Sequence, residues 1–174
     1  YPEKGINALK AAAQAVTAIP CGRVDKVTMA NIAEFHAPGS LNQVPDRGQF
    51  KMEVRSHREQ NLQSWIDRAH RELEQACAQV GASFTMERAR CTGAVSVPED
   101  SPLIRMLVEI YRELDFEAGP AAGFGGSDTA WLFANGLEAV NLGTGMGNLH
   151  SVDEFIRMED LERVTRVLEK LAAR

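Results

Sequence analysis

The chain has 174 residues, with 19 Lys and Arg against 24 Asp and Glu, so its formal net charge at pH 7 is −5. This acidic balance and a sequence pI of about 5.4 argue against a broad nucleic-acid surface. Hydrophobic residues make up 44% and charged residues 25%, as in a globular protein of one ordinary domain or two small ones. No apolar run approaches the ~20 residues that a membrane span needs, and residues 1–20 lack the charged-then-apolar order of a signal peptide.

The cysteines and histidines form no local metal-binding motif. Cys21, Cys77 and Cys91 are odd in number and lack CxxC spacing, so we expect buried free thiols in a reducing cytoplasm. No two of the four histidines lie three or four residues apart, which excludes a local zinc box of that type.

The first half of the chain opens with a predicted helix and two predicted strands. Apolar residues recur at helical spacing from Lys4 to Ala18. Apolar and polar residues then alternate over 28–36 and, more regularly, over 49–55, which predicts two strands. The turn sequence at 37–40 follows the first of them.

A long helix and a further strand complete this half. Ser56 and Glu59 have capping-box spacing ahead of an apolar stripe that runs from Leu62 to Val80. Gly81 is a good C-terminal stop, and alternation over 83–91 predicts another strand. The order α-β-β-α-β predicts a two-layer α+β unit of ferredoxin-like type without its first strand. We expect a piece of a longer parent; the alternative is a natural variant without that strand.

The second half predicts an incomplete α/β segment. In chain order it has a helix capped by Ser101, a helix from Ser127 to Asn135, a short buried strand over 139–142 and a last helix with an apolar stripe over 161–171. A single short strand cannot make a sheet. This half therefore requires partner strands that the sequence does not supply.

Two glycine-rich loops carry the candidate chemistry of this second half. Gly125-Gly126-Ser127-Asp128 precedes a predicted helix, so its backbone N–H groups could hold an anion such as a carboxylate; the alternative is a capped turn. The loop from Asn141 to Ser151 follows the predicted strand and contains His150. Ligands bind at such strand ends, so His150 is a candidate metal ligand or base, or else a structural or solvated histidine.

Two polar residues of the first half are further candidates. Asn42 lies between the two predicted strands, where it acts either as a turn residue or as a ligand contact. Arg55 ends an alternating strand on its polar face. There it is either a solvated cation or a bidentate clamp for a carboxylate.

Taken together in chain order, these motifs resemble peptidase T-like zinc exopeptidases. Residues 1–95 resemble the lid (dimerisation) domain of that family through Pro2-Glu3-Lys4-Gly5-Ile6-Asn7-Ala8, Gly22-Arg23-Val24-Asp25, Asn31-Ile32, Asn42-Gln43-Val44-Pro45-Asp46 and Arg55-Ser56. Residues 96–174 resemble the C-terminal part of its catalytic domain through Gly125-Gly126-Ser127-Asp128, Asn141 to His150, Asp153-Glu154-Phe155 and Glu159-Asp160-Leu161. The wider superfamily includes aminoacylase, carboxypeptidase G and succinyl-diaminopimelate desuccinylase.

The resemblance implies roles for individual residues. His150 matches the last zinc ligand, and Asn42 and Arg55 match lid residues that reach the carboxylate end of the substrate. The loop that lines the substrate pocket is matched by Gly125, Gly126 and Ser127, with Asp128 expected to fix that loop. Local departures are Cys21 in place of Leu, Ala37-Pro38 in place of two glycines and Phe124 in place of a third loop glycine.

The resemblance also implies an activity. The intact family member binds two zinc ions, hydrolyses a peptide or amide bond of a short peptide or N-acyl amino acid, and forms a homodimer through the lid, in the cytoplasm and without a nucleic-acid or membrane partner. Its other zinc ligands and general base lie in a segment before Tyr1. Because a catalytic zinc needs about three protein ligands, we expect residues 1–174 alone to be inactive. The alternative is a non-catalytic dimerisation or interaction module derived from the family.

Overall fold

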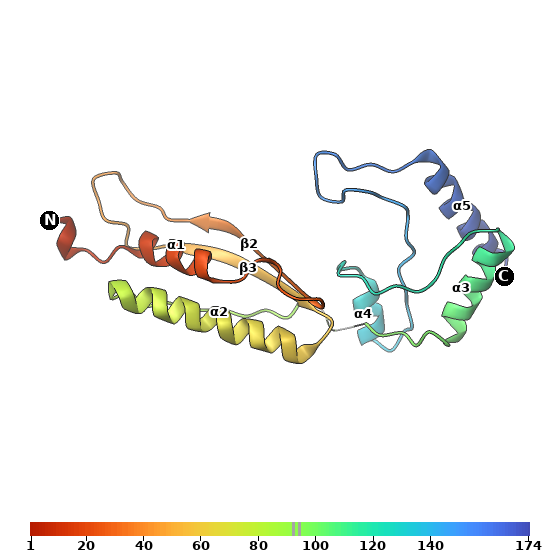
Figure 1. The fold of residues 1–174 in the computed structure, drawn as a ribbon, viewed down its shortest axis with the longest axis horizontal. Coiled ribbons are helices and arrows are strands. Elements are labelled where there is room, and N and C mark those ends of the chain that lie inside the picture. The colour runs from red at the N-terminus through yellow and green to blue at the C-terminus, as the bar shows by residue number, and fades with distance from the viewer. Residues whose placement is uncertain (92, 94) are drawn as a thin grey trace. The chain divides into compact units, whose positions relative to one another are not determined.

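The structure, a computed structural model, describes residues 1–91, 93 and 95–174 and divides into two compact units, Tyr1–Ala89 and Arg90–Arg174. Unit 1 contains a 3-10 turn η1 (Pro2–Lys4), α1 (Ala8–Ala18), β1 (Gly22–Arg23), β2 (Thr28–His36), β3 (Gln49–Ser56) and α2 (Glu59–Val80) (Figure 1). Unit 2 contains α3 (Pro102–Glu113), α4 (Thr129–Ala134) and α5 (Met158–Ala172). Among the described residues this is a mixed α/β chain with five α-helices and one three-stranded antiparallel sheet.

The sheet of unit 1 has the order β1-β2-β3 and confirms the two main predicted strands. β2 and β3 pair from Thr28↔Ser56 to His36↔Gln49, with an irregularity near Glu34, whose φ is +52°. The twelve-residue connection between them leaves the sheet at the His36–Gln49 end, so the hairpin places this loop and residue 55 at opposite ends.

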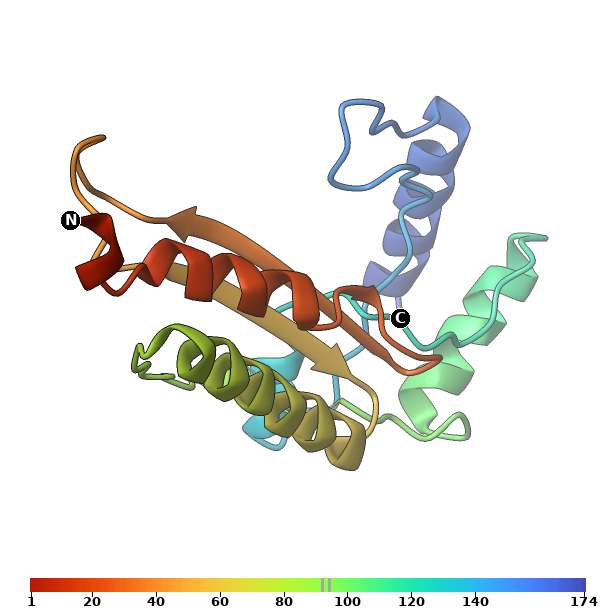
Figure 2. The same cartoon turned by 60° about the vertical axis from the view of Figure 1, so that its left-hand side comes forward.

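Helices α1 and α2 lie side by side over one face of this sheet (Figures 1 and 2). The alternation in β3 directs its apolar side chains toward the helices and its charged ones outward, as the period-2 pattern predicts. The indole of Trp65 is buried in the core of unit 1 and donates a hydrogen bond from Nε1 to the carbonyl of Pro20 at 2.9 Å. The core cluster consists of Ala15, Ile19, Ala30, Trp65, Ala69, Leu73 and Ala76.

Hydrogen bonds explain where the helices of unit 1 begin. α1 begins at Ala8 rather than Lys4 because Asn7 Oδ1 accepts from the backbone N–H of Lys10 at 3.1 Å. The predicted capping box is wrong: Arg58 precedes α2 without a side-chain cap. Ser56 instead donates from Oγ to the carbonyl of Val27 at 3.0 Å, which fastens the end of β3 to the neighbouring turn.

Asp25 closes the turn between β1 and β2. Its carboxylate accepts from the backbone N–H of Val27 at 2.7 Å and from Asn61 Nδ2 of α2 at 3.1 Å. The backbone hydrogen bond from Val27, followed by that from Asn61, lowers the pKa of Asp25 below its ordinary value. The turn is thereby tied to the first part of α2.

The strand predicted over 83–91 is wrong, although Gly81 does end α2, in the left-handed region at φ +75°. The segment after Gly81 has no strand assignment, yet Phe84 and Met86 pack against the core cluster. In the predicted unit its pairing partner is the missing first strand, and the described residues supply no substitute. The segment therefore packs its apolar side chains without sheet hydrogen bonds.

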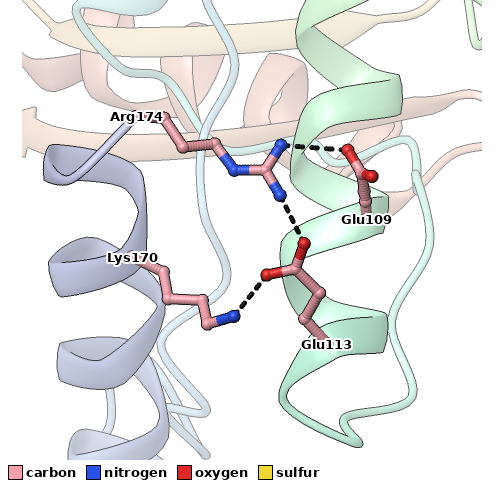
Figure 3. Close-up of polar contacts among 4 residues, drawn as sticks. All are labelled: Glu109, Glu113, Lys170 and Arg174. Atoms are coloured by element: carbon pink, nitrogen blue, oxygen red, sulfur yellow. Dashed lines mark hydrogen bonds and ion pairs between the residues drawn. The ribbon is translucent and has the colours of Figure 1, made fainter.

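In unit 2, α3 and α5 pack against one another. Their contact contains the fully buried side chains of Ile110 and Val167. Ion pairs at the edge connect Lys170 to Glu113 and Arg174 to both Glu109 (2.9 Å) and Glu113 (2.6 Å) (Figure 3). The hydrogen bond from Lys170 is the main cause that lowers the pKa of Glu113.

Two further predictions for unit 2 need correction. Residues 139–142 form no strand, because a buried parallel strand needs neighbours and no strand is assigned within the described part of this unit. The α5 stripe is buried only at Val167, while Leu161 and Leu168 remain about half exposed. The helix from Pro102, in contrast, is confirmed with its cap: Ser101 Oγ accepts from Ile104 N at 3.1 Å.

The expectation of three buried thiols is also wrong. Cys77 is buried in α2, and burial raises the pKa of its thiol, whereas Cys21 and Cys91 are exposed. Cys21 follows the end of α1, and Cys91 is the last residue of the segment over 83–91 that forms no strand. Within the described residues, no helix combines the length and apolar character that crossing a membrane would require.

The core of unit 1 generates a stability prediction. Trp65→Ala should lower the free energy of unfolding by about 3–5 kcal/mol, because loss of a buried aromatic leaves a cavity. Trp65 is 5% exposed, whereas Trp131 of unit 2 is 60% exposed, so Trp131→Ala is the matched control, with an expected change within about 0.5 kcal/mol. Urea denaturation followed by far-UV circular dichroism measures both. Equal losses in the two variants would contradict this description of the core.

Candidate functional site

Arg55 lies near the end of β3 on the face of the sheet away from the helices. Its guanidinium is about half exposed and forms an ion pair with Glu53, two residues earlier on the same strand face. Lys51 and Glu34 form a second ion pair on these strands, at 2.6 Å. An exposed guanidinium of this kind could exchange its internal partner for the carboxylate of a ligand, because surface ion pairs are weak.

Asn42 lies in the loop between β2 and β3, and it is exposed. The loop is fastened to the start of α1: the N–H of Ala8 donates to the carbonyl of Pro45 at 2.9 Å, and Val44 packs against Gly5. Arg55 is six residues along β3 from the other end of this connection, a separation of about 20 Å at strand spacing. In one copy of unit 1, Arg55 and the loop that carries Asn42 therefore lie at opposite ends of the hairpin.

The two glycine-rich loops of unit 2 are joined by a hydrogen bond. Asn141 Nδ2 donates to Ser127 Oγ at 2.9 Å, and the hydroxyls of Ser127 and Thr129 are also hydrogen bonded. Ser127 does not cap a helix as predicted, because its hydroxyl is used in these contacts and α4 begins at Thr129 with Asp128 before it. The structure therefore brings together the two glycine-rich loops that the sequence analysis identified as candidates.

The predicted anion cradle has a different local structure from the one expected. α4 has only six residues, and Asp128 makes no side-chain cap hydrogen bond with it. Gly125 and Gly126 are exposed, and a Cβ at Gly125 would meet no atom within 4 Å. Neither packing against neighbouring atoms nor the start of α4 thus requires a glycine at position 125. The role expected for Gly125 therefore depends on a ligand.

The second loop, in contrast, is closed by its own contacts. Gly147 and Phe155 form an antiparallel bridge, with N–H to carbonyl distances of 2.9 and 3.1 Å. A Cβ at Gly147 would lie 2.6 Å from the Phe155 ring, and one at Gly145 would lie 2.5 Å from the Cβ of Asp160. Both glycines are therefore required by close packing, and Gly145 also has a φ of +76°.

Asp160 supports this loop from the first turn of α5. It is a buried carboxylate, bound by Arg157 Nε at 2.8 Å and by Arg163 Nη1 at 3.6 Å. Its hydrogen bond to Arg157 further raises the pKa of that guanidinium. A paired carboxylate at a helix N-terminus is also favoured by the helix dipole, so Asp160 forms a stable wall for the bend at Gly145.

His150 is exposed within the closed loop, and its backbone is in the left-handed region at φ +65°. Its N–H donates to Glu154 Oε2 at 2.7 Å. Ser151 Oγ donates to the carbonyl of Asn148 at 2.8 Å and accepts from the N–H of Asp153 at 3.1 Å. The loop thus fixes the main chain around His150 by short-range hydrogen bonds.

A complete metal centre does not fit the residues described. Among them, no group of three or more His, Cys, Asp or Glu side chains is placed to hold an ion. His150 offers a single imidazole, and the nearby carboxylate of Glu154 is used by a backbone N–H. The described residues therefore do not by themselves bring together the roughly three protein ligands that a catalytic zinc needs.

Three residues that lie in the motifs quoted for the family resemblance, but to which the sequence analysis assigned no role, have clear structural roles. Asn141 joins the loops, Glu154 binds the His150 backbone, and Asp160 packs against Gly145. Apart from those motifs, the local signals were that Glu154 follows His150 by four residues and that Asp160 stands in the first turn of a predicted helix. Neither spacing distinguishes such a contact from a solvated acid.

Comparison with known proteins places this geometry in a family. Peptidase T of Serratia proteamaculans is 26% identical over 97% of the chain. Among solved structures, a tripeptidase of Staphylococcus aureus matches 99% of the chain with a TM-score of 0.82 at 24% identity. The Bacillus subtilis YxeP protein, a dinuclear metal-binding peptidase of the M20 family, matches 96% with a TM-score of 0.61 at 21% identity. At these identities the two structures show a shared fold.

The matches extend over nearly all of this chain and over less than half of each relative. The chain spans 42% of the Serratia peptidase T, 48% of the Staphylococcus tripeptidase chain and 46% of the YxeP chain. The model of peptidase family M20/M25/M40 matches residues 5–174, and the chain therefore belongs to that family.

Proposed function

We propose that residues 1–95 are a lid (dimerisation) domain without its first strand and that residues 96–174 are the C-terminal part of a catalytic domain. Together they form part of a zinc-dependent peptidase T-like enzyme that hydrolyses a short peptide or an N-acyl amino acid. The observation that carries this proposal is the 2.9 Å hydrogen bond between Asn141 and Ser127, which joins the two candidate loops within one unit. Family membership and the names of the relatives, a peptidase T and a tripeptidase, support it.

Within this proposal, each unit contributes a different part of the site. His150 supplies one zinc ligand, and a segment outside this chain supplies the others and the general base. Gly125, Gly126 and Ser127 line the pocket, and Asp128 fixes that loop through its carbonyl, which accepts from the N–H groups of Trp131 and Leu132 at 3.0 Å each. Arg55 binds the substrate carboxylate.

The lid would also mediate self-association. β3 is an edge of the described sheet, and β1 covers β2 only at Met29 and Ala30. Unpaired strand edges favour pairing with another chain, so we propose a homodimer through unit 1. Asn42 and Arg55 lie at opposite ends of the hairpin, and we propose that in the homodimer both reach the carboxylate end of the substrate. The cytoplasmic location expected from the cysteine pattern belongs to the same proposal.

The first experiment measures hydrolysis by residues 1–174. With added zinc and a tripeptide, the chain should show no turnover, because a single imidazole does not assemble metal-bound water. The same chain extended to the length of its relatives should hydrolyse the peptide. Turnover by residues 1–174 near an ordinary enzyme rate of ~10 per second would refute the proposed division of ligands. An extended chain that dimerises without hydrolysis would favour a non-catalytic interaction module.

The role of His150 is tested in the extended polypeptide. His150→Ala should reduce bound zinc, measured by atomic absorption, and lower activity by about a hundredfold or more, since even outer-shell partners of metals contribute 10–100-fold. His57→Ala, which changes an exposed histidine of unit 1, should leave zinc content unchanged. Full zinc content in the His150 variant would exclude it as a ligand.

The role of Arg55 is tested by substrate affinity. Arg55→Ala should raise KM for a tripeptide by about one to two orders of magnitude, because a hydrogen bond to a charged group contributes about 1.5–3 kcal/mol. Lys51→Ala removes the same charge from the same face of β3 and should change KM little. A KM that responds equally to both variants would indicate a general effect of charge instead of a specific contact.

A further inference from the structure

The conformation of His150 needs an explanation that the proposed zinc role does not provide. A residue with a β-carbon is strained in the left-handed region, where its Cβ approaches the following carbonyl oxygen. His150 nevertheless has φ +65°, and Asn148, two residues before it, has φ +52°. Strained backbone of this kind persists only where the surroundings determine it, so some contact must favour this conformation of His150.

Glu154 supplies such a contact. Its Oε2 accepts from the backbone N–H of His150 at 2.7 Å, a short distance typical of a charge-assisted hydrogen bond. The contact spans four residues within one closed loop, so it forms without the participation of any other element. An N–H directed at this carboxylate restricts the peptide plane before His150, and with it the direction in which the imidazole leaves the chain.

One other contact bears on the His150 backbone, because the N–H of Ser151 donates to the carbonyl of Asn148 at 3.2 Å and closes a turn whose central residues are Leu149 and His150. The Gly147–Phe155 bridge closes the base of the loop, and Ser151 binds the backbone of Asn148 and Asp153. These bonds define the overall bend. The bond to Glu154 differs from them because it engages the backbone N–H of His150 itself and brings a side chain to the turn.

We propose that Glu154 is a positioning residue that holds the His150 backbone in the left-handed conformation and so presents the imidazole toward its ligand. This inference rests on the proposed function for the identity of that ligand, but its geometric content does not. Glu154 acts through His150 and contacts neither metal nor substrate itself. The adjacent Asp153 has a different relation to the loop, because its backbone N–H donates to Ser151 and its carbonyl accepts from Asn148.

Nuclear magnetic resonance of residues 1–174 tests the inference without any metal. A residue with positive φ shows a strong cross-peak between its own amide and α protons, because these protons are close in that conformation. His150 should show this signal in the unaltered chain and lose it in Glu154→Ala. Glu154→Gln, which retains an oxygen acceptor, should restore it at least in part. Asp153→Ala removes a neighbouring negative charge and should leave the signal intact.

A second readout separates positioning from general folding of the loop. Cross-strand signals between Gly147 and Phe155 should persist in Glu154→Ala, because their bridge does not use the carboxylate. Retention of the His150 signal in that variant, or its loss together with the Gly147–Phe155 signals, would overturn the inference. Loss in Asp153→Ala to the same degree would overturn it as well, since charge alone would then explain the effect.

The two proposals fail in distinguishable ways. If His150→Ala leaves the zinc content of the extended enzyme unchanged, the proposed function loses its metal ligand, while the signals of residues 1–174 still report on Glu154. If Glu154→Ala leaves the His150 signal unchanged, the positioning role is excluded and the zinc experiment is unaffected.

Discussion

The hydrogen bond from Asn141 to Ser127 is the constraint on which the organisation of unit 2 as a site depends. The two residues it joins are fourteen positions apart and lie on either side of α4, a helix too short to hold the two loops in place by itself. Without a sheet in the described part of this unit, no strand ends fix the loops side by side. The side-chain amide of Asn141 therefore holds the two loops together, whereas adjacent parallel strands hold such loops side by side in a complete α/β domain.

The loop around His150 is held in a different way, by contacts among residues that are close together in the sequence. Glycine at 147 admits the Phe155 ring, glycine at 145 admits Asp160, and the Glu154 carboxylate binds the main chain of His150. Each of these contacts spans fifteen residues or fewer, so the loop can form before the rest of a domain is assembled. Unit 1 has the opposite character, since its Arg55 depends on β3 being paired with β2 in one register.

The sequence predicted those elements whose signals are local. The strands at 28–36 and 49–55, the long helix ended by Gly81 and the helix capped by Ser101 all follow from periodicity and terminal residues within their own segments. The predictions of strands at 83–91 and 139–142 were wrong because an apolar segment becomes a strand only when another strand pairs with it. The sequence of the segment itself does not show whether such a partner is present. The loops carrying Ser127 and His150 were identified for the same local reason, whereas Asn141, Glu154 and Asp160 act through contacts that spacing does not reveal.

Several apolar side chains of unit 2 remain exposed, because no sheet covers them within the described residues. Leu107, Ile110, Ala130 and Val167 are its buried hydrophobic residues among those described, while Leu161, Leu168 and Trp131 remain well exposed. Apolar helix faces gain stability in proportion to the area they cover, so the α3–α5 contact supplies only part of what these sequences could bury. The ion pairs of Glu109 and Glu113 with Arg174 do not replace that area, because exposed pairs contribute little. A sheet lying against α5 would bury the remaining stripe, and residues 139–142, which are apolar except for Asn141, are a segment of this chain suited to join it.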